Sequence, residues 1–270
     1  MNAVFAAMML VATVLADRPP EANRSNIRTM PVARSAESTT IVLAISTPKP
    51  GQLLSANPVW VQFRIDGYAL GAASSQFDRA NEIAVCKMGQ TIHFVIDNMP
   101  YFAINEPALD PFDESGFYYN TRYKFQLPFR LKDGIHTIRA FPARSFGESL
   151  KGENGFVARN FYVGDEENNP QIDLSQPYIT YNEPSDQVRN EEGKPVLLDF
   201  LVSNAELSSD GYKVRVSIDG KVNRIVTSYQ PFYIYGLKKG KHTVRLELLG
   251  EENKLVPGIF NDVQQTFTVH

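Results

Sequence analysis

The chain has 270 residues, of which 43% are hydrophobic and 21% are charged, so it can bury hydrophobic cores and has room for two domains. Its net charge of −3 and its pI near 5.9 leave no excess of basic side chains to displace counterions from a phosphate backbone, which excludes general nucleic-acid binding. The single cysteine, Cys86, can form no internal disulfide and cannot complete a zinc site alone, so we interpret it as a small buried hydrophobic residue.

The N-terminal region predicts export. Residues 1–16 form an apolar run ending in a small-x-small pattern that suits cleavage after Ala16, and the run is shorter than the roughly 20 residues of a membrane span. Residues 17–39 are rich in Arg, Ser, Pro and Ala without a hydrophobic period, which predicts a flexible tether. We expect a secreted, periplasmic or cell-surface protein with no membrane span in the mature chain, soluble or held by its N-terminus.

From residue 40 onward, short β-rich runs with a period of two alternate with turns rich in Gly, Pro, Asn and Asp. The run "PVWVQFRI" begins at Pro58, "PVLLDFLV" begins at Pro195, and "KVRVSIDG" begins at Lys213. Alternation places successive side chains on opposite faces of a strand, and no stretch shows a sustained helical period. This pattern is typical of antiparallel β-sandwiches.

The chain also repeats itself. "FRLKDGIHTIRAFP" returns as "YGLKKGKHTVRLEL", and in both copies a phenylalanine follows the histidine after 25 positions, from 136 to 161 and from 242 to 267. The matched pairs are Pro48 and Pro184, Asp97 and Asp219, Leu131 and Leu237, Gly134 and Gly240, His136 and His242, Arg139 and Arg245, and Phe161 and Phe267. Such self-similarity predicts two sandwiches, at residues 40–164 and 177–270, joined by an acidic linker at 165–176.

The repeated histidine allows two interpretations, a metal or catalytic pair and a duplicated structural element. Gly134 permits a turn with positive φ, and the strand after it places His136 beside that turn, where the imidazole can hydrogen-bond the turn backbone. Equivalent residues of an extended tandem pair lie about a domain length apart, too far to share a metal ion. We therefore expect two structural histidines and no metal site.

These motifs carry a family resemblance. The Pro-containing first strand, "V-x-V-x-I-D-G", "G-L-x-x-G-x-H-T-V-R" and the final "F-x-V" strand resemble the immunoglobulin-like or fibronectin type III-like modules of exported bacterial proteins, over nearly all of residues 39–270. The resemblance implies an all-β fold of two tandem Ig-like sandwiches, and it implies no activity, because such modules host unrelated functions. The disulfide and core tryptophan of antibody domains are missing, since Trp60 has no counterpart in the second copy.

Motifs of catalysis are missing as well. The sequence contains no G-x-S-x-G, P-loop, G-x-G-x-x-G or H-E-x-x-H motif, so we expect a protein that is not an enzyme and needs no cofactor. The acidic string from Asp165 to Asp173 could supply oxygen ligands to Ca²⁺, but it lacks the wider ligand pattern of calcium-binding linkers, and a solvated hinge is the interpretation we adopt.

One loop distinguishes the first copy. Asp97 and His136 are 39 positions apart, whereas Asp219 and His242 are 23 apart, so 16 extra residues lie near 104–121. Aromatic side chains in a loop can bind sugar rings or a protein partner, or they can fold back to close the end of the sandwich or pack on the second domain. The predicted binding residues are Phe112, Phe117, Tyr118 and Tyr119.

The function that follows is a non-catalytic exported binding, adhesion or spacer module at the cell envelope, whose partner is a surface protein or a glycan. The alternatives are a carbohydrate-binding accessory domain of a polysaccharide-degrading system and a purely structural spacer. Coplanar exposed aromatic rings would favour the carbohydrate function, and a contiguous apolar patch or an open edge strand would favour adhesion.

Overall fold

A computed structural model of the chain describes residues 27–37, 40–55, 57–83, 89–106, 108–109, 119–120, 122–164, 172–185, 187–188 and 194–270. The predicted signal-like segment, Cys86 and most of the predicted linker lie outside these residues. Among the described residues, no helix has the length and apolar character needed to cross a membrane.

The first sandwich is built from two sheets that enclose one hydrophobic core. One sheet has the order β2 (Val42–Thr47), β4 (Trp60–Asp66), β9 (Arg122–Gln126). The other has the order β3 (Gln52–Leu54), β11 (Val157–Val163), β10 (Gly134–Ala143), β5 (Thr91–Ile96), β6 (Phe102–Ile104), with β3 parallel to β11. Alternate residues of each strand, such as Val61, Phe63 and Phe94, fill the core between the sheets.

The second sandwich repeats this strand order. Its smaller sheet has the order β12 (Tyr178–Glu183), β14 (Val196–Ser203), β17 (Phe232–Tyr235). Its five-stranded sheet has the order β13 (Gln187–Val188), β19 (Asp262–Val269), β18 (Gly240–Leu249), β15 (Lys213–Ile218), β16 (Lys221–Val226), with β13 parallel to β19. The all-β prediction of two Ig-like sandwiches is confirmed, and a second core lies between these sheets.

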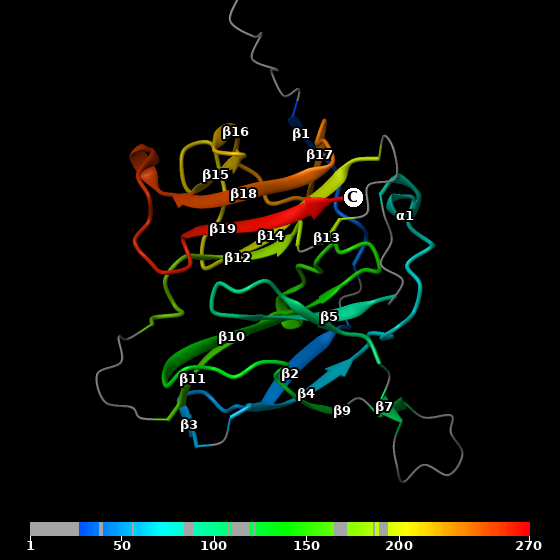
Figure 1. Cartoon of the computed structure of the whole chain (residues 1–270), viewed down its shortest axis with the longest axis vertical. Coiled ribbons are helices and arrows are strands. Elements are labelled where there is room, and N and C mark those ends of the chain that lie inside the picture. The colour runs from blue at the N-terminus through cyan, green and yellow to red at the C-terminus, as the bar shows by residue number, and fades with distance from the viewer. Residues whose placement is uncertain are drawn as a thin grey trace, which may run out of the picture.

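Short elements connect the strands. They are α1 (Arg79–Glu82), β7 (Ala108–Leu109), β8 (Tyr119–Asn120), and the 3₁₀ turns η1 (Glu153–Gly155) and η2 (Glu251–Asn253). β7 and β8 pair as a ribbon within the predicted insertion, and Figure 1 shows this ribbon at the end of the molecule farthest from the second sandwich.

The duplicated histidine has the same hydrogen bonds in both copies. His136 Nδ1 lies 2.8 Å from Asp97 Oδ2 and its Nε2 lies 2.8 Å from the carbonyl oxygen of Lys132. His242 has the same two distances, to Asp219 and to the carbonyl oxygen of Lys238. Both aspartates have positive φ, 51° and 49°. The prediction that both histidines bind the backbone of the neighbouring turn is confirmed.

Two further pairs of repeated residues occupy equivalent positions in the two sandwiches. Pro48 and Pro184 each follow a cis peptide bond at the point where the chain leaves the smaller sheet for the larger one. Phe161 lies opposite His136 in β11, and Phe267 lies opposite His242 in β19. The repeated unit is therefore a whole sandwich.

The two sandwiches are stacked face to face, so the molecule has four layers of strands (Figure 1). The outer face of the β5–β10 sheet packs on the outer face of the β12–β14 sheet, where Val95 and Phe141 meet Leu201. A second contact cluster contains Phe146, Leu197 and Tyr233. The sequence left the relative orientation of the two domains open, and the extended pair used above to separate the two histidines is not the arrangement observed. Both facing sheets carry apolar side chains that need cover.

Part of the predicted tether at 17–39 is also corrected. Residues 28–31 form strand β1 (Arg28–Pro31), which pairs antiparallel with β17 and so extends the smaller sheet of the second sandwich. Asn223 fixes β1 with side-chain hydrogen bonds to the amide of Thr29 and to the carbonyl oxygen of Ile27. The strand escaped prediction because its buried residue is a threonine and its contacts are polar, so no hydrophobic period marks it.

Candidate functional site

A network of buried polar side chains lies between the two sandwiches. Asp199 on β14 accepts hydrogen bonds from Asn182 Nδ2 at 2.7 Å and from the Ser149 amide at 3.1 Å, and it forms an ion pair with Lys151 at 2.7 Å. The side chains of Lys151 and Asp199 are 1% and 0% exposed. A serine and a lysine this deeply enclosed have no access to a substrate, so we assign the network to domain docking.

His93 on β5 belongs to the same network. Asn182 uses its amide nitrogen as a donor to Gly147 and Asp199, so its Oδ1 is the acceptor for the Nδ1–H of His93 at 2.7 Å. Burial lowers the pKa of His93 to about 4, and the imidazole is therefore neutral at physiological pH. Its ring stacks on Tyr101 with centroids 3.6 Å apart.

Tyr101 hydrogen-bonds Glu183, whose carboxyl group has a raised pKa. Its hydroxyl donates to Glu183 Oε1 at 2.5 Å, and the other carboxyl oxygen accepts the amide of Ser185 at 2.8 Å. Burial raises the pKa of Glu183 to about 8, more than these hydrogen bonds lower it. This carboxyl group is therefore protonated in the folded protein at neutral pH.

The segment after β1 runs along the domain boundary as a strap, residues 32–37. Glu148 accepts hydrogen bonds from the amide and the hydroxyl of Ser35 and pairs with Arg79, which also donates to Tyr233 and to the carbonyl oxygen of Ala33. Both side chains of the Arg79–Glu148 pair are at least nine-tenths buried. The strap thus connects α1 and the β10–β11 loop of the first sandwich to β17 of the second.

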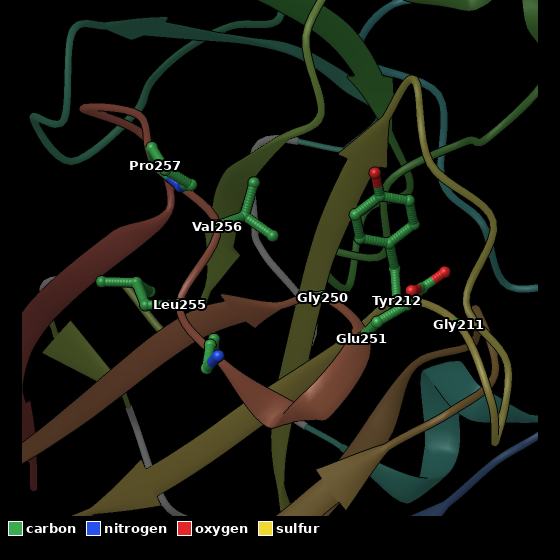
Figure 2. A pocket seen from close by; sticks show the side chains of 8 residues that line it. Gly211, Tyr212, Gly250, Glu251, Leu255, Val256 and Pro257 are labelled. Carbon is green, nitrogen blue, oxygen red and sulfur yellow. The ribbon is translucent and has the colours of Figure 1, made fainter.

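An open depression lies at the loop end of the second sandwich, between the β14–β15 and β18–β19 loops (Figure 2). It has a volume of about 350 Å³, within the range of roughly 300–1,000 Å³ that small-ligand sites occupy. Its lining residues are Gly211, Tyr212, Gly250, Glu251, Lys254, Leu255, Val256 and Pro257. We call it the loop-end depression.

The lining combines an aromatic ring, apolar side chains and a charged rim. The side chains of Tyr212 and Val256 lie on opposite sides of the hollow in Figure 2. Leu255 is 45% exposed, which leaves apolar surface open to a ligand. Lys254 extends into solvent and pairs with Glu252 at 2.5 Å. This arrangement can hold a small apolar or ring-shaped group while the rim contacts polar substituents.

The backbone beside the depression is strained. Glu252 and Asn253 follow one another in the left-handed region, with φ of 59° and 57°. Left-handed backbone costs free energy for a residue with a side chain, and in native proteins it is concentrated at functional sites. Gly250, at the start of the same turn, has an ordinary φ of −88°.

A second hollow of about 250 Å³ lies on the first sandwich. It is lined by residues of the strap, of β10 and of the β10–β11 loop, including Glu37, Ile41, Leu150 and Gly152. It contains no aromatic side chain and borders the strap, so it ranks below the loop-end depression as a binding site.

Most of the predicted binding residues lie outside the described part of the chain. Phe112, Phe117 and Tyr118 are among them, and Tyr119 is placed only as a backbone residue of β8. The aromatic loop stays a prediction.

Among the described residues no group of three His, Cys, Asp or Glu side chains is placed to hold a metal ion. Asp173, at the end of the predicted acidic linker, accepts hydrogen bonds from Ser175 and Gln176.

The sequence interpretation missed the residues of the loop-end depression. Their signal was present in two polar turns, "SSDGY" before β15 and "GEENKLVPG" before β19, in which Tyr212 and Leu255 stand out as apolar residues. Spacing alone does not reveal that the two loops meet, because about 40 residues separate them (212 to 255) and the sandwich topology brings them together.

Comparisons with known proteins give no family. No family model matches the chain, and no curated protein matches it. Solved structures that resemble it include the fibronectin(III)-like modules of Clostridium thermocellum CbhA, at 12% identity and a TM-score of 0.26, over 84% of this chain and 93% of that one.

Two other resembling structures are larger. The SGBP-B protein of the Bacteroides ovatus mixed-linkage glucan utilization locus matches at 13% identity and a TM-score of 0.22, over 88% of this chain and 71% of that one. Dimeric latent PorU of Porphyromonas gingivalis matches at 16% identity and a TM-score of 0.24, over 93% of this chain and 21% of that one. TM-scores this low give no information on ligand or activity.

Proposed function

We propose that the chain is a non-catalytic binding module that acts outside the cytoplasm and holds its ligand in the loop-end depression of the second sandwich. The observation that carries this proposal is the combination of exposed apolar lining, an aromatic ring and a charged rim in one hollow. Loops at the end of a β-sandwich commonly carry binding because the strands beneath them hold them in place.

The docked sandwiches support the same proposal. Two domains usually move relative to each other unless the interface between them is large and hydrophobic. Here the interface contains two buried apolar clusters and the enclosed Lys151–Asp199 ion pair, which hold the two sandwiches as one body. A rigid support reduces the entropy that is lost when a ligand orders its binding site. The buried His93, Asp199 and Lys151 serve this support, which favours a binding role over catalysis.

Export is part of the proposal because of the apolar run at residues 1–16. β1 and the β7–β8 ribbon lie at opposite ends of the molecule in Figure 1. A chain held by its N-terminus would therefore present the ribbon away from the anchor. The partner would be a surface glycan or protein, which agrees with the prediction from sequence.

The test fills the depression. A Cβ atom on Gly250 would lie 3.5 Å from Val256 Cγ2 and 4.0 Å from Tyr212 Cε1, so Gly250→Leu occupies the hollow without a backbone clash. The matched control is Gly152→Leu, which adds the same side chain to the second hollow. Both proteins and the unaltered chain are applied to a glycan array and to a purified envelope fraction, after their melting temperatures are compared.

We expect a ligand whose binding Gly250→Leu weakens at least tenfold and Gly152→Leu changes less than twofold. A ligand that both variants bind with unchanged affinity would show that the loop-end depression is not the site. The absence of any ligand would favour the structural spacer over the binding module.

A further inference from the structure

The outer face of the β2–β4–β9 sheet is the surface on which the first sandwich differs most from the second. The strand "PVWVQFRI" corresponds to "PVLLDFLV", so Trp60, Gln62 and Arg64 stand where the second sandwich has Leu197, Asp199 and Leu201. Those three residues are buried against the first sandwich. The same fold position is thus a docking face in one copy and open to solvent in the other.

This open face carries positive charge around one aromatic ring. Trp60 is 43% exposed, and Lys124 Nζ on the neighbouring strand lies 4.6 Å from the centre of its ring. Arg64 and Arg122 project from the same face, since the alternate residues of β4 and β9 fill the core. Asp66 is the acidic residue of these two strands, and it forms a 2.7 Å ion pair with Arg64.

The two arginines are direct cross-strand partners. The register of β4 and β9 places Arg64 opposite Arg122 and Gln62 opposite Lys124. Three cationic side chains of two neighbouring strands therefore lie on one face of the sheet. An extended anionic ligand lying across the two strands could contact all three.

We propose that this face, the Trp60 platform, binds an acidic polysaccharide built from uronic acids. Sugar rings have apolar faces that stack on an exposed indole, and uronate carboxylates form charge-assisted hydrogen bonds with arginine and lysine. Trp60 and Arg64 lie four residues apart on one strand, roughly 13 Å at 3.3 Å per residue, so the ligand must be an extended chain.

The chemistry of the face disfavours other occupants. The centre of a protein–protein interface is depleted of charged residues, whereas this surface carries three cations on two neighbouring strands. This proposal does not depend on the loop-end depression, which belongs to the other sandwich.

Trp60 is the only tryptophan of the chain, so its fluorescence reports on this face alone. The probes are polygalacturonate, polyglucuronate and alginate, with fully methyl-esterified polygalacturonate as a control that keeps the rings and lacks the charge. The variants are Trp60→Ala and the double change Arg64→Gln with Arg122→Gln. The control variant is Lys239→Gln with Lys241→Gln, which removes two exposed charges from the second sandwich.

We expect at least one uronate polymer to change the Trp60 emission and to bind at least tenfold more tightly than the ester. Affinity is measured by isothermal titration calorimetry, because Trp60→Ala removes the fluorescent residue. It should fall at least tenfold in both platform variants, fall with added salt, and change less than twofold in the control variant and in Gly250→Leu. The proposal is overturned if none of the three polymers binds, if the ester binds equally well, or if Trp60→Ala keeps full affinity. Tighter binding to oligo(dT) or to phosphatidylglycerol vesicles than to every uronate polymer would also overturn it.

Discussion

Arg139 and Arg245 occupy the same position of the repeated strand, yet one is buried between the sandwiches and the other faces solvent. Arg139 is 1% exposed, donates to the carbonyl oxygens of Ile179 and Asp97, and lies over the ring of Phe260 at 4.2 Å. Arg245 lies on the solvent-facing side of β18 and donates two 2.6 Å hydrogen bonds to Asp262 of the neighbouring strand β19. The equivalent arginine therefore holds the two sandwiches together in the first copy and forms a surface ion pair in the second.

Replacing each arginine should separate these roles. Arg139→Ala leaves two buried carbonyl oxygens without their donor, and we expect the free energy of unfolding to fall by about 3 kcal/mol. Arg245→Ala removes an exposed ion pair and should cost no more than about 1 kcal/mol. Guanidinium chloride unfolding of both variants measures the difference, and equal losses would contradict the docking role of Arg139.

The strap should protect the domain boundary. Glu148→Ala removes the acceptor of Ser35 and leaves Arg79 unpaired in a buried site, so we expect a loss of about 3 kcal/mol and faster tryptic cleavage after Arg34. Lys241→Ala changes an exposed residue of β18 and serves as the control. Cleavage after Arg34 at the same rate in all three proteins would show that residues 32–37 are not held by these contacts.

Glu183 should make stability depend on pH. The folded protein keeps this carboxyl protonated up to about pH 8, whereas the unfolded chain releases the proton near its ordinary pKa of 4.5. Unfolding therefore releases a proton between pH 4.5 and 8, and stability falls as pH rises through that window, by up to about 1.4 kcal/mol per pH unit. Above pH 8 this contribution is constant.

Glu183→Gln removes that dependence. We expect its free energy of unfolding, relative to the unaltered chain, to increase from pH 5 to pH 8 and then to level off. His93 acts in the opposite sense and in a lower window: the folded state keeps it neutral down to about pH 4, so its contribution is lost as pH falls below 6.5. A difference between variant and unaltered chain that does not change with pH would contradict the protonated state of Glu183.

The aromatic loop can be tested in the same way as the depression. Changing Phe117, Tyr118 and Tyr119 together to alanine should weaken binding of an envelope glycan or protein at least tenfold while the melting temperature stays the same, if the loop contacts the ligand. Unchanged binding with a melting temperature many degrees lower would show that these rings stabilise the sandwich.

Much of the fold could be predicted from the sequence because both copies preserve the same local chemistry. The Asp–His pair, the glycine with positive φ and the phenylalanine opposite the histidine recur at fixed spacing, and each has its own physical cause. The strand β1 could not be predicted in this way, since a four-residue strand with one buried threonine leaves no periodic signal.

A comparison of the two copies shows a sequence difference that accompanies the docking of the sandwiches. Val95 and Phe141 in the first copy stand where the second has Ser217 and Glu247, so only the first copy offers an apolar outer face on this sheet. The loop-end depression was harder to foresee, because its two loops are distant in sequence and its apolar residues lie in polar turns. Long-range topology, which spacing does not show, decides both features.

The face-to-face arrangement supports both proposed binding surfaces, and small-angle X-ray scattering of the folded chain tests it most directly. A compact body of this length has a radius of gyration of roughly 19 Å, whereas two sandwiches of roughly 13 Å each, held end to end about 40 Å apart, give roughly 24 Å. We expect the chain without residues 1–26 to give a value near the roughly 18 Å of a compact body of residues 27–270, and Arg139→Ala to raise it. A value near 24 Å for the unaltered sequence would contradict the docked arrangement.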